Sequence, residues 1–147
     1  MRTLLYIIPF PLSCLNSHGQ IPRTDSLTKQ LNNNEIKPDG NFFGPTFYLS
    51  NGPGTELLKT GRSVSESLLA VLNDSARGGV AHYILTSLWK DSIPWVSPVY
   101  IEREDILIFT LNELVFFMKS GNVFANRSDL ELKALKWKIF LGNKNNP

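Results

Sequence analysis

The sequence predicts an α+β fold, and three observations lead to that prediction. Two stretches between residues 55 and 89 repeat apolar residues at the spacing of amphipathic helices. Short β-rich runs follow at residues 106–110, 114–118 and 123–125. A last helical pattern has its apolar side formed by Leu130, Ala134, Trp137 and Leu141. We therefore expect a helical hairpin, then a small three-stranded antiparallel meander, then a C-terminal helix.

The length and composition are those of one ordinary globular domain. The chain has 147 residues, of which 42% are hydrophobic and 19% are charged, and such values are typical of single folded domains. The formal net charge is only +2. A charge this small gives no electrostatic reason to expect nucleic acid or a membrane surface as partner.

Residues 1–13 have the pattern of an export signal, with Arg2, an apolar run at residues 4–12 and the small residue Ser13. The run is shorter than the ~20 residues that span a bilayer. Cys14 follows directly, and this arrangement resembles the lipoprotein box of bacterial lipoproteins. The resemblance implies a lipid attached to Cys14 and a lipid-anchored protein of the cell envelope or periplasm. Two alternatives are cleavage near residues 18–20, which would release a soluble secreted protein, and no processing.

Residues 14–40 are rich in Asn, Ser, Thr, Pro and Gln and include three consecutive asparagines at 32–34. Few apolar residues recur there at a regular period, so we expect a flexible linker. We expect residues 41–147 to form a single α+β domain. The aromatic-rich residues 42–49 are expected to make a loop followed by a short extended piece.

Local signals divide the helical region into three pieces. A short helix at residues 55–60 ends at Gly61. Ser63 and Glu66 have the spacing of a capping box that opens the second helix. Residues 73–75 separate it from a third helix, which ends at Trp89. Two glycines near the start of that helix, Gly78 and Gly79, are best explained by close approach of neighbouring elements.

Residues 55–89 resemble a single HEAT-type helical repeat. The residues that carry the resemblance are a leucine pair, a glycine at the turn and an Asn/Asp corner: Leu57, Leu58, Gly61, Leu68, Leu69, Leu72, Asn73 and Asp74. The resemblance implies a helical scaffold that binds other proteins.

The C-terminal third has its own boundary signals. Residues 112–113 and 120–122 are the expected turns of the meander. Ser128 and Glu131 form a second capping-box pattern before the last helix, and Gly142 is expected to end it.

The inventory of reactive side chains predicts no catalytic centre, no metal site and no cofactor. His82 is the single histidine outside the N-terminal segment, and no nucleophile-elbow sequence accompanies it. A hydrogen-bonded, partly buried role for His82 is therefore favoured over a hydrolase. Three or four zinc ligands cannot be assembled convincingly from this sequence.

Three aromatic residues flank a proline-containing loop and form the alternative binding site: Trp89, Trp95 and Tyr100. Such rings can stack on sugars, although they fill hydrophobic cores more often. We therefore expect a non-enzymatic envelope domain whose partner is another protein. A carbohydrate-binding module using the aromatic loop is the alternative, and a small hydrolase using His82 comes third.

Overall fold

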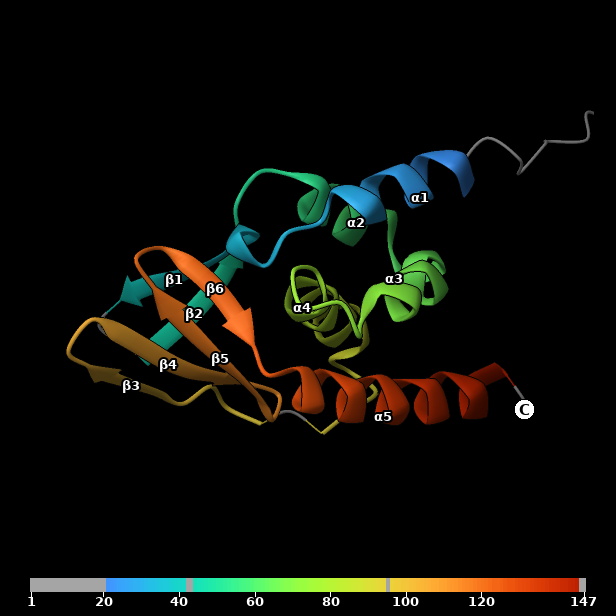
Figure 1. Ribbon diagram of the computed structural model, residues 1–147. Helices are drawn as coiled ribbons and strands as arrows, with labels where there is room; N and C mark the ends of the chain where they lie inside the picture. Colours follow the sequence, from blue (N-terminus) through green and yellow to red (C-terminus); the bar gives the residue numbers. More distant parts are fainter. Residues whose placement is uncertain (1–20, 42–43, 95, 146–147) are drawn as a thin grey trace, which may run out of the picture.

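The computed structural model describes residues 21–41, 44–94 and 96–145, and these form an α+β fold, as predicted. Figure 1 shows the helices gathered on one side of the strands. The helices are α1 Ile21–Gln30, η2 Asn33–Glu35, α2 Pro53–Thr60, η3 Arg62–Val64, α3 Ser65–Val71, α4 Gly78–Trp89 and α5 Arg127–Asn145. The strands are β1 Ile36–Asn41, β2 Gly44–Leu49, β3 Tyr100–Arg103, β4 Ile106–Leu111, β5 Leu114–Lys119 and β6 Asn122–Ala125.

The larger sheet is an antiparallel meander of four strands, in the order β3-β4-β5-β6. The predicted meander of three strands is therefore wrong by one strand. In the missed strand β3, Tyr100 pairs with Phe109 and Arg103 pairs with Ile106 of β4. All four residues of β3 are exposed, so the strand lacks the alternation of buried and exposed residues that identifies strands in a sequence.

A second, two-stranded sheet is formed by β1 and β2, which pair antiparallel. In Figure 1 it lies behind the larger sheet. Phe47 of β2 stacks on Phe109 of β4 with ring centroids 4.3 Å apart, and Phe109 stacks in turn on Phe116 of β5 at 4.9 Å. This column of rings joins the two sheets, so one face of the meander is buried and the other faces outward.

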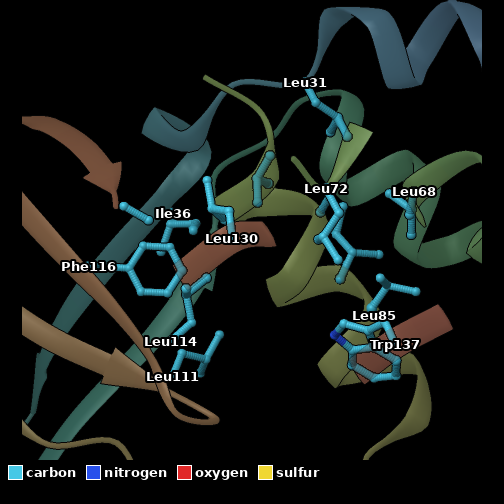
Figure 2. Packing of buried hydrophobic residues seen from close by; sticks show 14 of the residues in the cluster. Leu31, Ile36, Leu68, Leu72, Leu85, Leu111, Leu114, Phe116, Leu130 and Trp137 are labelled. Atoms are coloured by element: carbon cyan, nitrogen blue, oxygen red, sulfur yellow. The ribbon is translucent and has the colours of Figure 1, made fainter. Parts of the chain in front are cut away.

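The hydrophobic core lies between the inner face of the meander and the helices. Figure 2 shows Ile36 and Phe116 on the strand side, and Leu68 and Leu72 on the helical side. All four are fully buried. The apolar side predicted for the last helix is also confirmed, since Leu130, Ala134, Trp137 and Leu141 are at most 8% exposed.

The flexible linker predicted at residues 14–40 is wrong from Ile21 onward, because α1, η2 and β1 occupy that segment. Hydrogen bonds of the Asn33 side chain explain much of the order in this segment. Its side-chain Oδ1 accepts a hydrogen bond from the Val80 backbone N–H at 3.0 Å, and its Nδ2 donates to the Ser75 carbonyl at 2.8 Å. The buried amide thus holds the first turn of α4.

The two following residues tie the same segment to other elements. Asn34 Oδ1 accepts from the Val123 N–H of β6 at 2.7 Å. The Glu35 carboxylate accepts from the Asn32 N–H at 3.0 Å and from the Gly54 N–H at 2.8 Å. Gly54 lies in the first turn of α2, where a negative charge is favourable. Side chains that suggested a flexible linker therefore accept hydrogen bonds from backbone N–H groups of helices and of a strand.

The helix boundaries agree with the sequence in part. Gly61 ends α2 at φ 84°, and α4 ends at Trp89, both as predicted. The expected capping box at Ser63 and Glu66 is absent, because a 3-10 turn precedes α3 and no side chain caps that helix. The predicted stop at Gly142 is wrong, since α5 continues to Asn145. A glycine within an exposed helical turn costs only about 1 kcal/mol.

The predicted helical hairpin matches only partly. Helices α3 and α4 pack together, but α4 also packs against α2 and α5, and α1 packs against α2 and α3. An added Cβ at Gly79 of α4 would lie 2.6 Å from Phe116 Cε1 and 2.9 Å from Asn33 Oδ1. The close approach expected at this glycine is therefore present.

Candidate functional site

His82 is a buried structural residue. It lies on α4 and its side chain is fully inaccessible to solvent. Nδ1 lies 3.0 Å from the Trp137 indole nitrogen, and Nε2 lies 3.1 Å from the Leu111 carbonyl oxygen. An indole N–H can only donate, so Nδ1 must accept and the ring proton must reside on Nε2.

This arrangement fixes the neutral form of the imidazole. Burial lowers the pKa of His82 from 6.5 to about 4, although the hydrogen bond to the Leu111 carbonyl opposes the shift. Both ring nitrogens are occupied by protein groups, so neither is free to exchange a proton with a substrate. The geometry speaks against the hydrolase alternative.

Two of the predicted aromatic residues lie in the described segments. Trp89 is partly buried, and its indole N–H donates to Ser65 Oγ at 3.0 Å. The Arg62 guanidinium lies 4.3 Å from its ring centroid, and Phe140 meets the ring edge-on at 5.4 Å. These contacts occupy the indole, so it is not an open platform for a sugar ring. Tyr100 lies on β3 and is 49% exposed.

Trp95 and Cys14 lie outside the described residues, so the aromatic loop and the lipid attachment remain predictions. Within the described residues, no group of three or more His, Cys, Asp or Glu side chains is placed to hold a metal ion. No described helix combines the length and the apolar character needed to cross a bilayer.

A row of apolar side chains crosses the outward face of the meander. We call it the outer row; its members are register partners on the four strands: Ile101, Ile108, Phe117 and Phe124. Register partners share one face of a sheet. Ile101 is 48% and Phe124 is 45% exposed, and the rings of Phe117 and Phe124 stack with centroids 5.7 Å apart.

The outer row continues to the edge of the sheet. Val99, just before β3, is 57% exposed. Among the described strands only β4 pairs with β3, so the other side of β3 is an open edge. An exposed edge strand beside an apolar face is a typical site for pairing with another chain.

The sequence analysis missed the outer row, although it found three of the four strands. Residues 106–109 and 114–118 are continuous apolar runs, which are typical of strands buried on both faces. Here only the inner face is covered, so Phe109 and Phe116 are buried whereas Ile108 and Phe117 stay partly exposed. Because apolar residues occupy both faces of these strands, the sequence alone does not distinguish an exposed apolar face from a buried one.

Comparison with protein-family models, with curated proteins and with solved structures finds no match to this chain.

Proposed function

We propose that this protein is a non-enzymatic binding domain of the cell envelope, and that another protein docks on the outer row. The exposed apolar row across all four strands of the meander carries the proposal. Contiguous apolar surface costs free energy in water and commonly marks a protein interface. Aromatic side chains such as Phe117 and Phe124 are also enriched at the centres of interfaces.

The envelope location rests on the pattern of the first 13 residues and on Cys14. Intact-mass spectrometry of the protein from its native host tests this part. A mature chain that begins at a lipid-modified Cys14 is expected. A chain that still begins at Met1 would contradict export, and a later start without lipid would indicate soluble secretion.

The docking part is tested by charge substitutions in the outer row. A partner is first recovered from the native host and purified, and its affinity is then measured against Ile101→Glu and Phe124→Glu. A carboxylate buried in an apolar interface is expected to weaken binding about tenfold or more. Leu132→Glu is the matched control, because Leu132 is a 53% exposed leucine on α5, a helix that contributes no residue to the outer row.

The variants must keep their thermal unfolding transitions for the comparison to hold, and the exposure of all three sites favours this. Equal loss of binding in Leu132→Glu, or full binding by both outer-row variants, would refute the docking site. If the purified protein instead dimerises through the outer row, the partner is a second copy and the proposed heterologous contact is wrong.

The sugar-binding alternative has weaker support. Its platform would require the Trp89 ring, whose indole already contacts Arg62, Ser65 and Phe140. Oligosaccharide that quenches tryptophan fluorescence saturably would favour this alternative over protein docking.

A further inference from the structure

A separate cavity of about 260 Å³ lies between the loop after α4, the turn between β4 and β5, and one side of α5, with His82 of α4 also in its lining. It shares no residue with the outer row. Most of its wall is apolar, formed by Ile93, Pro94, Val96, Trp137 and Phe140. The volume is just below the roughly 300–1,000 Å³ of pockets for drug-sized ligands, so the cavity suits a small molecule.

The polar part of the wall carries a surplus of one positive charge. Lys133 donates to Glu113 Oε2 at 2.8 Å, and Lys136 donates to the same oxygen at 3.1 Å. Two ammonium groups thus face one carboxylate. Both lysines lower the pKa of Glu113, to about 2, so its carboxylate stays charged at neutral pH.

Lys133 is the unusual member of this cluster, because its side chain is only 8% exposed. Its ammonium also donates to the Asn112 carbonyl at 3.0 Å. An ammonium group has three donors, and the described residues provide acceptors for two of them. A buried cation with a spare donor is a favourable place for an anionic acceptor.

We propose that this cavity binds a small monocarboxylate with an apolar body, whose carboxylate contacts Lys133 and Lys136 and whose body packs on Trp137 and Phe140. The single surplus charge favours a monoanion over a phosphate dianion, because the second negative charge of the dianion would not be neutralised by any cation of the wall. This inference is independent of the proposed docking on the outer row.

Benzoate is a suitable probe, and benzyl alcohol is its neutral counterpart. Trp137 reports binding, because this residue lines the cavity and its indole N–H gives a separate nitrogen–proton NMR signal, which Trp137→Phe identifies. Benzoate is expected to shift this signal saturably, whereas benzyl alcohol is expected to bind about tenfold more weakly or worse. No saturable shift with benzoate, or equal affinity for the two compounds, would overturn the proposal.

Two substitutions are expected to act in opposite directions. Lys136→Gln removes one ammonium and should weaken benzoate binding about tenfold. Glu113→Gln removes the competing carboxylate and should strengthen binding. Lys138→Gln is the control of equal charge change, since Lys138 lies on the same helix but not in this cavity. An equal loss in Lys138→Gln, or weaker binding in Glu113→Gln, would overturn the assigned site.

Discussion

The burial of neutral His82 makes a quantitative prediction about stability and pH. The folded-state pKa is about 4, below the ordinary 6.5 that we assign to the unfolded chain. As pH falls, the unfolded chain therefore takes up the proton first. The stabilising contribution is complete above the unfolded pKa and is lost as pH falls from 6.5 towards 4. For these two pKa values, the free energy of unfolding should fall by about 2 kcal/mol between pH 7 and pH 5.

Urea denaturation followed by tryptophan fluorescence measures this loss. The control is His82→Gln, which cannot titrate but can still donate one hydrogen bond and accept another. Carboxylates and His18 are the same in both proteins, so the difference between the two pH profiles isolates His82. The variant is expected to be less stable at pH 7 and to have a flatter profile. Parallel profiles would refute a neutral, buried imidazole.

Three further substitutions test the packing around α4 and α5. Gly79→Ala should cost about 3 kcal/mol of unfolding free energy, because the new Cβ would meet Phe116 and Asn33 at 2.6 and 2.9 Å; a loss below 1 kcal/mol on urea denaturation would contradict this contact. Gly142→Ala has no neighbour within 4 Å and should stabilise α5 by up to ~1 kcal/mol; destabilisation would show that the helix does not continue through this position. Thr86→Val should raise the free energy of unfolding by about 1 kcal/mol, because Thr86 Oγ1 is buried without a hydrogen-bond partner among the described residues; a lower melting temperature would show that the hydroxyl is satisfied.

Regular periodicity was the part of the fold that the sequence predicted well. The end of α4 at Trp89 and the buried side of α5 follow from helical spacing and turn residues. Strand β3 was not predicted, because all four of its residues are exposed and the strand has no buried face. Its existence depends on pairing with β4, which is a tertiary contact that local sequence does not encode.

The prediction of a flexible linker in the asparagine-rich segment failed for a different physical reason. Composition favoured disorder, yet Asn33 and Glu35 are buried and each satisfies backbone N–H groups of a distant helix. One local signal was present: Asn32 and Glu35 have capping-box spacing, and the structure forms that box. Their longer-range partners, Val80 and Gly54, could not be inferred without the fold.

The candidate sites, too, depend on long-range contacts that the sequence alone does not reveal. The role of His82 as a hydrogen-bonded, buried residue agrees with the favoured prediction, although its partners Trp137 and Leu111 come from other elements. The outer row and the cavity beside Lys133 combine residues from several segments each. Strand register and helix packing create both of them, so no motif in the sequence marks either one.

Site-specific photo-crosslinking in the native host tests the central claim most directly. A benzophenone side chain placed at Phe124 is expected to crosslink a defined protein, and Ile101→Glu should abolish that product. The same probe at Leu132 of α5 should not produce it. A partner captured equally from Leu132, or a Phe124 product unaffected by Ile101→Glu, would contradict docking on the outer row.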